Sequence, residues 1–273
     1  MRKAVLVVIF LMLLPAMAAE APREDQSEFY FTRLIYTEND LRGGGFGRRN
    51  GTMENPGPYK CPEFGGGNFF PPQGWGWATD TPGSDCKLMG AIHRMTGQSV
   101  YPNPNYMEIL NPNLFKYPYA YMVEPGQMYL NEKEAARLRE YLLRGGFLHL
   151  DDFWGTRESA NVGDQLRKIF PDREIKELPL NHPVFHSFFE IPEVLQVPNQ
   201  GNGCRGGSTS EQDGYEAHVL GISDDRGRLM VVITQNSDLG DAWEYMDLAC
   251  YPQKYTGYAL RMGVNLMIYA ITR

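Results

Sequence analysis

Two adjacent carboxylates at the end of an apolar run are the residues best placed to do chemistry in this sequence. Residues 147–150 form a short, mostly apolar segment typical of a strand that is covered on both faces, and Asp151 and Asp152 follow it directly. Open α/β sheets bind ligands beyond the carboxyl ends of their strands, where these acids would lie. Neighbouring carboxylates repel when both ionise, which raises one pKa for acid catalysis or creates a cation site. The structural alternative is that one aspartate caps the next turn and the other is solvated.

A second candidate closes a long glycine-rich stretch. Trp75 and Trp77 put two aromatic faces beside the carboxylate of Asp80. Aromatic faces next to acids suit sugar rings or cationic groups. Alternatively, the tryptophans anchor the loop on the core and Asp80 caps the following turn.

A third acidic and aromatic segment lies near the carboxyl terminus of the chain. It contains Asn236, Asp238, Asp241 and Trp243. These residues could converge with Asp151 at the same sheet edge, although turn formation alone would also explain them.

Two histidines have the spacing of a metal-binding pair on a helix. His182 and His186 are separated by four positions, but Pro183 between them disfavours a regular helix through both. We therefore expect no metal centre and no cofactor, and His182 is kept as a ligand-binding candidate.

The first residues of the chain predict export. Arg2 and Lys3 precede an apolar run over residues 4–14, and small residues at 16–18 complete the pattern of a cleavable signal peptide over residues 1–18. The run is shorter than the roughly 20 residues that cross a bilayer, so we expect no stable membrane insertion after cleavage. The expected location is periplasmic or extracellular.

Four cysteines fit that location. Cys61, Cys86, Cys204 and Cys250 are an even number in a chain bound for an oxidising compartment, which predicts at least one disulfide. Three pairings are possible, and free buried thiols are the alternative. None of the cysteines forms a CxxC pair, which argues against structural zinc.

Composition restricts the partners. The net charge of −7 and the isoelectric point near 5.3 argue against nucleic acid, since no cluster of Lys and Arg is present to neutralise phosphates. Beyond the signal, residues 19–27 are polar and read as a flexible segment, and residues 28–273 have the length of a single domain.

Helical and strand patterns alternate along that domain. Strands are predicted at 28–36, 106–110, 118–123 and 147–150, with a hairpin of 216–222 and 228–234; helices are predicted from Asp85 to Gly97, from a capping box at Asn131 and Glu134 to Gly145, near 162–170 and near 260–271. This alternation predicts an α/β fold with a mainly parallel sheet and an antiparallel hairpin. Residues 42–74 lack periodicity, as in a functional or a disordered loop.

Several separated motifs, in order, resemble one family. They are Trp75-Gly76-Trp77 with Thr79-Asp80, residues 117–121, residues 138–147, Asp151-Asp152-Phe153-Trp154-Gly155, residues 182–185 and Gly240-Asp241-Ala242-Trp243. Together they resemble the domain-of-unknown-function family 4159 over nearly all of the mature chain. That family is similar to the class I glutamine amidotransferase-like fold, which implies a flavodoxin-like three-layer sandwich. The resemblance implies no particular activity.

The chain departs from the amidotransferases at one informative position. Those enzymes place a nucleophilic cysteine on a sharp turn after a central strand, where this chain has Asp151 and Asp152. Without a thiolate, thioester chemistry has no nucleophile, so we expect no glutaminase activity.

Three functions of different classes fit these features. The favoured one is an exported binding module for a small molecule, glycan, peptide or cation. The second is a hydrolase, possibly acting on glycans, in which two of Asp80, Asp151, Asp152 and Asp241 serve as acid and as base or nucleophile. The third is a structural or assembly protein of the cell envelope. The candidate ligand-binding residues are Trp75, Trp77, Asp80, Asp151, Asp152, Trp154, His182, Asp238 and Asp241.

Overall fold

The computed structural model describes residues 28–38, 61 and 76–273. The predicted signal peptide, the segment 19–27 and all of the irregular stretch 42–74 except Cys61 lie outside these residues.

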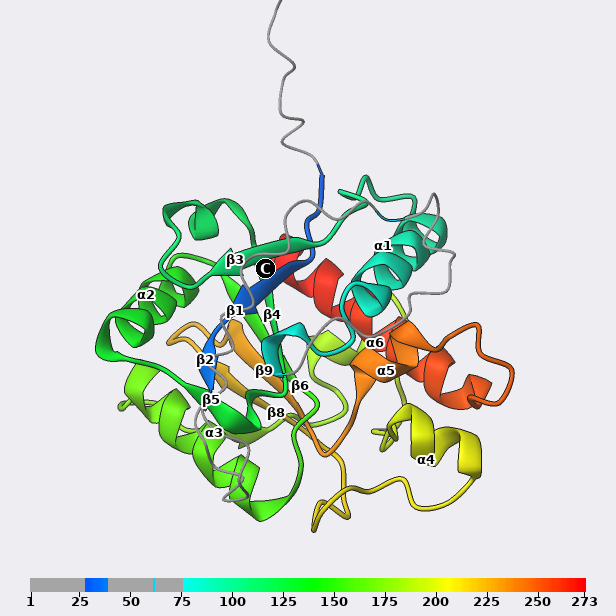
Figure 1. The fold of residues 1–273 in the computed structure, drawn as a ribbon. Helices are drawn as coiled ribbons and strands as arrows, with labels where there is room; N and C mark the ends of the chain where they lie inside the picture. Colours follow the sequence, from blue (N-terminus) through cyan, green and yellow to red (C-terminus); the bar gives the residue numbers. More distant parts are fainter. Residues whose placement is uncertain (1–27, 39–60, 62–75) are drawn as a thin grey trace, which may run out of the picture.

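A seven-stranded sheet in the order β3-β1-β4-β6-β9-β8-β7 forms the centre of the fold (Figure 1). Its strands are β1 (Thr32–Ile35), β3 (Asn105–Glu108), β4 (Tyr119–Val123), β6 (Phe147–Asp151), β7 (Lys176–Glu177), β8 (His218–Ser223) and β9 (Leu229–Gln235). Strands β3, β1, β4, β6 and β9 are parallel, β8 is antiparallel to β9, and β7 is antiparallel to β8. The predicted mainly parallel sheet with an antiparallel hairpin is confirmed.

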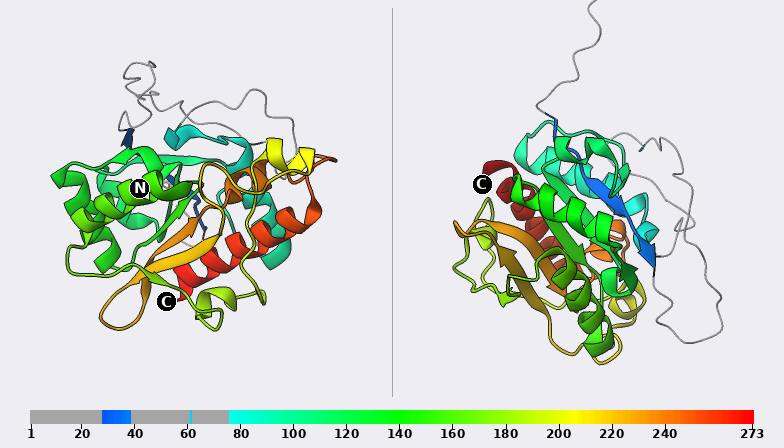
Figure 2. Two further views of the ribbon diagram at one scale, coloured as in Figure 1. Left: turned by 90° about the horizontal axis from the view of Figure 1, so that it is seen from below. Right: turned by 90° about the vertical axis from the view of Figure 1, so that its left-hand side faces the viewer.

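Helices cover both faces of the sheet. In Figures 1 and 2, α1 (Gly83–Thr96), α5 (Leu239–Glu244) and α6 (Gln253–Thr272) lie on one face, and α2 (Glu132–Leu143) and α3 (Gly155–Ile169) lie on the other. The fold also contains a short helix, α4 (Gln200–Arg205), and a small antiparallel ladder of β2 (Thr37–Glu38) with β5 (Met128–Tyr129). Within the residues that the structure describes, no helix is both long and apolar enough to span a membrane.

Local sequence signals set the ends of the helices. The side chain of Asn131 accepts hydrogen bonds from the backbone of Lys133 (2.9 Å) and Glu134 (3.0 Å), and the Glu134 carboxylate accepts one from the Asn131 backbone (2.9 Å). The predicted capping box of α2 is therefore confirmed. Helix α1 ends at Gly97, whose φ of 69° is a left-handed conformation that suits glycine.

The two sheet faces differ in polarity. Because successive side chains alternate between faces, Ala120 and Met122 of β4 pack in the core under α2 and α3, whereas Tyr119 and Tyr121 point to the core under α1 and α6. That second face also carries His149 of β6, which is fully buried. A line of polar side chains therefore runs under α1, α5 and α6 toward the carboxyl ends of the strands.

Two disulfides tie the periphery to this layer. Cys61 is bonded to Cys86 of α1, with Cα atoms 5.6 Å apart, and Cys204 of α4 is bonded to Cys250, with Cα atoms 4.8 Å apart. The expectation of at least one disulfide is confirmed, and the fold selects one of the three possible pairings.

Candidate functional site

The carboxyl ends of the central strands carry unusual backbone conformations. Glu124, Asp152 and Asn236 follow β4, β6 and β9, and their φ angles are 51°, 56° and 56°. Asp80, just before α1, has a φ of 63°. Such left-handed conformations are uncommon for residues other than glycine, although Asp and Asn adopt them more readily than most, and they gather at functional sites. The chain also reverses its direction of winding between β1 and β4, where open α/β sheets form ligand crevices.

Asp151 lies at this edge with both oxygens occupied. Its Oδ1 accepts a hydrogen bond from the Thr234 hydroxyl (2.6 Å), and its Oδ2 accepts from the Tyr121 hydroxyl (2.9 Å) and the Gly240 backbone (3.1 Å). Burial raises the pKa of Asp151 to about 7. Its donors come from β9, β4 and the start of α5, so this carboxylate joins three elements.

A buried histidine continues this network into the core. Burial lowers the pKa of His149 to about 3, so its ring is neutral, with one nitrogen donating and the other accepting. The Thr234 hydroxyl donates to Asp151, so His149 Nε2 donates to Thr234 (2.9 Å) and Nδ1 accepts from the Tyr119 hydroxyl (2.9 Å). The chain of hydrogen bonds is complete without a ligand, which fits a structural role.

Asp152 belongs to a different arrangement. Its Oδ1 accepts a hydrogen bond from Trp154 Nε1 (2.8 Å), and its carboxylate lies with those of Glu211 and Asp238, one oxygen from each residue falling within 4.8 Å of the others. Burial, followed by the charge of Glu124, raises the pKa of Asp152 well above its ordinary value. Asp238 also caps α5, accepting from the Asp241 backbone at 2.7 Å.

A second group of carboxylates surrounds Asp80. One oxygen from each of Asp80, Asp241 and Glu244 lies within 4.8 Å of the others. Asp80 is 4% exposed, and its Oδ2 has no hydrogen-bond partner among the described residues. Helix α1 begins after Pro82 without a side-chain cap, so the Asp80 carboxylate does not cap it.

Two glycines make room for this group. A Cβ atom at Gly240 would lie 2.1 Å from Asp80 Oδ2, and one at Gly83 would lie 2.9 Å from Glu244 Oε1. A Cβ atom at either position would require the carboxylate to shift. The close approach of these carboxylates to the backbone therefore favours glycine at both positions.

Negative charge is in excess here. Burial, then the charges of Asp241 and Glu244, raise the pKa of Asp80 well above its ordinary value, and burial raises the pKa of Glu244 to about 8. Among the described residues, two cations lie beside the group, and both already have partners. Arg33, which lowers the pKa of Asp80, is paired with Asp85, both side chains being fully buried. Lys87, which lowers the pKa of Glu244, is paired with Asp247. The cluster therefore has more buried carboxylates than the paired cations beside it neutralise.

The tryptophans of the described part are packed inside. Trp77 is 1% exposed and contacts Tyr106 edge-on at 5.6 Å between ring centroids. Trp154 and Trp243 are 3% and 0% exposed, and the Trp243 ring nitrogen donates to a backbone carbonyl of α6. None of these three rings offers a free face to a sugar. Trp75 lies outside the described residues.

His182 lies away from the acids. Its ring contacts Tyr269, which also contacts Phe147 at the first residue of β6, whereas Asp151 is the last residue of that strand. His182 therefore lies toward the amino end of β6. Its Nδ1 accepts from the Val184 backbone (3.2 Å) and starts a short 3-10 helix. The structure does not bring it to either of the two carboxylate groups.

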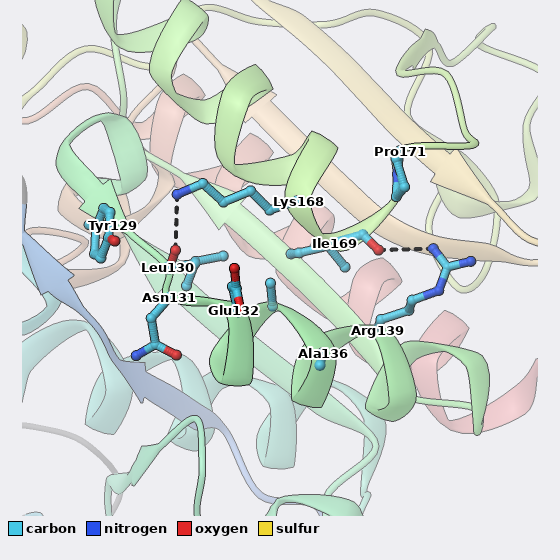
Figure 3. A pocket seen from close by; sticks show the side chains of 10 residues that line it. Tyr129, Leu130, Asn131, Glu132, Ala136, Arg139, Lys168, Ile169 and Pro171 are labelled. Carbon is cyan, nitrogen blue, oxygen red and sulfur yellow. Dashed lines mark hydrogen bonds between the residues drawn. The ribbon is translucent and has the colours of Figure 1, made fainter.

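A separate groove of about 480 Å³ lies between α2 and α3, on the other face of the sheet (Figure 3). Two cations line it, but both have partners: Lys168 donates to the Leu130 carbonyl (2.9 Å) and Arg139 donates to the Ile169 carbonyl (2.9 Å). These contacts join the two helices, and nothing in the groove indicates a ligand.

Two members of the acidic groups, Glu211 and Glu244, were not identified from the sequence, and neither was Glu124, whose charge acts on Asp152. Glu124 follows β4 as Asp152 follows β6, and Glu244 follows the motif 240–243 directly. The position of Glu124 at the end of a strand and that of Glu244 beside the motif could therefore have identified both residues. Glu211 lies in an irregular segment and carries no local signal.

The fold and the site define an α/β protein with an acidic cluster at the carboxyl ends of its parallel strands. The chain belongs to the family described as domain of unknown function (DUF4159), whose sequence profile matches residues 72–271. That range contains every acidic residue of the two groups. No curated protein matches the chain with significant similarity.

Proposed function

We propose that this protein is an exported ligand-binding module whose acidic cluster holds a positively charged ligand. The observation that carries the proposal is the buried Oδ2 of Asp80, which has no partner among the described residues and lies among other carboxylates. A buried carboxylate is costly unless it is paired, hydrogen-bonded or protonated. A cationic ligand would supply the missing partner.

Export is supported by the two disulfides, which are typical of oxidising compartments, and by the signal pattern of the first residues.

Binding is favoured over glycoside hydrolysis by spacing and access. Hydrolytic carboxyl pairs stand about 5 to 9.5 Å apart across an open cleft. Here one oxygen from each residue of a group lies within 4.8 Å of the others, and Asp80, Asp152 and Asp238 are buried. A purely structural role accounts for Asp151, whose oxygens have donors, but it leaves Asp80 unexplained.

A thermal-shift panel on the purified protein tests the proposal. The panel contains divalent metal chlorides, spermidine, a short oligolysine peptide and a neutral oligosaccharide. At least one cation should stabilise the wild type, by about 2.7 kcal/mol when present at 100 times its dissociation constant. The Asp80→Asn, Asp241→Asn variant should lose this response. Stabilisation by the neutral sugar alone, or by no member of the panel, would overturn the proposal.

A further inference from the structure

Deepening that proposed function, we propose that Asp80, Asp241 and Glu244 form a site for a hard divalent cation of the Ca²⁺ type. Two independent observations support it: the convergence of three carboxylates and the unpartnered buried oxygen of Asp80.

The donor set selects the class of ion. All three groups offer carboxylate oxygens, and neither histidine nor cysteine belongs to the group. Oxygen-only sets suit Ca²⁺, Mg²⁺ and Mn²⁺ rather than Zn²⁺ or copper. Ca²⁺ binds oxygens at about 2.3 to 2.6 Å, so two oxygens on one ion lie at most about 5 Å apart. Separations within 4.8 Å meet that limit.

The remaining hydrogen bonds leave one oxygen free for the ion. Asp241 Oδ2 accepts from the Gln200 backbone at 2.5 Å, and the Glu244 carboxylate is hydrogen-bonded by Tyr245. Only Asp80 has a buried oxygen without a donor in this group, and the charges that act on it most strongly are those of Asp241 and Glu244. The free oxygen lies against the backbone next to Asp241, since a Cβ atom at Gly240 would be 2.1 Å from it.

The other acidic group provides an internal control. Asp152 accepts from Trp154, Asp238 accepts from the Asp241 backbone, and Glu211 accepts from the Asn199 amide at 2.6 Å. Each member already has a donor, so this group does not show the orphan oxygen that marks the first one.

A shared proton is the competing occupant. Asp80 and Asp241 are close enough for a hydrogen bond when one of them is protonated. Two carboxylates that share a proton need no cation. Direct measurement of metal binding separates the two possibilities.

The test is isothermal titration of the full mature chain with CaCl₂ at pH 8 after treatment with a chelator, with MgCl₂ and ZnCl₂ for comparison. Wild type should bind one Ca²⁺ per chain with a dissociation constant at or below about 1 mM, the weak end of protein calcium sites. Asp80→Asn should weaken binding about tenfold or more, whereas Glu211→Gln should change it less than about twofold.

A second variant keeps the test decisive if Asp80→Asn folds poorly. Gly240→Ala retains all three carboxylates but places a methyl group 2.1 Å from the Asp80 oxygen, so it should also weaken Ca²⁺ binding. Absence of divalent binding to wild type, or equal affinities in wild type, Asp80→Asn and Gly240→Ala, would overturn the metal site. If spermidine or oligolysine alone stabilises the wild type, the metal site is wrong while the cation-binding function stands.

Discussion

Buried carboxylates of this site have different roles because their hydrogen-bond donors differ. Asp151 receives donors from three elements, whereas Asp80 lacks a donor on a buried oxygen. The type of residue is the same, so the surroundings decide which one is available to a ligand.

We expect Asp151→Asn to be destabilising and Asp80→Asn to be neutral or stabilising in the absence of metal. An amide at position 151 would place its two N–H donors opposite hydroxyl and backbone groups that are also donors. The lost hydrogen bonds should lower the free energy of unfolding by about 1 to 3 kcal/mol. Asn at position 80 removes the cost of keeping this buried carboxyl protonated or of ionising it beside other carboxylates, and it tolerates the positive φ. Urea unfolding with a chelator present measures both. Equal losses in the two variants would contradict this division of roles.

Arg33 is a second residue whose effect depends on its partner. Its guanidinium donates to Asp85 at 2.5 Å, to Ser84 Oγ at 3.0 Å and to the Thr79 carbonyl at 2.8 Å. It thereby links β1 to the first turn of α1 and to the chain just before that helix. Both charges of the Arg33–Asp85 pair are fully buried.

Arg33→Met should therefore cost about 3 to 5 kcal/mol, because it leaves Asp85 as an unpaired buried charge. The double variant Arg33→Met, Asp85→Leu removes both charges and should recover much of the loss. Chemical denaturation of the single and double variants gives the coupling energy. A double variant as unstable as the sum of the two single ones would show that the pair is not coupled.

At the scale of elements, helix α2 carries no residue of the acidic groups, so a change at its cap tests the effect of capping alone. In α2, Asn131 caps two backbone N–H groups on an exposed surface, away from the acidic cluster. Asn131→Ala should lower the free energy of unfolding by about 1 kcal/mol, within a range of roughly 0.5 to 2. Asn131→Asp serves as the matched control, since aspartate caps equally well. Unchanged stability in the alanine variant would mean that the cap contributes nothing here.

At the scale of the whole molecule, the buried carboxylates set the response to pH. Glu244 has a folded pKa of about 8 against an ordinary value of 4.5, and the pKa values of Asp80, Asp152 and Asp238 are also raised. An acid with a raised pKa keeps its proton up to a higher pH in the folded state than in the unfolded state. Its stabilising effect is therefore present at low pH and is lost as pH rises through the folded pKa.

With a chelator present, the free energy of unfolding should consequently fall between about pH 5 and pH 8, from just above the ordinary pKa of Glu244 to its folded pKa. Glu244→Gln removes one of these groups, so its decline over the same range should be shallower than that of wild type. Urea titrations at several pH values measure both slopes. A wild-type stability that rises with pH over this interval would show that these carboxylates ionise freely in the folded protein.

The sequence alone determined the main secondary-structure elements of this protein and the position of Asp151 at the end of a strand. The capping box of α2, the hairpin of β8 and β9 and the strand that ends at Asp151 depend on residues a few positions apart, and all three were predicted. Strand order then places the ends of β4, β6 and β9 at one edge, because parallel neighbours share their direction.

Only the tertiary structure decided which acids meet and which of them lack a partner. Asp80 and Glu244 are separated by more than half of the chain. The backbone at Gly240 and Gly83 leaves room for their carboxylates to come together. The pairing of the cysteines, the burial of Trp77 and the distant position of His182 were fixed in the same way. Local sequence patterns predict features that depend on residues a few positions apart, such as helix caps and the alternation of apolar residues. Donor counts, burial and charge repulsion are properties of the packed chain.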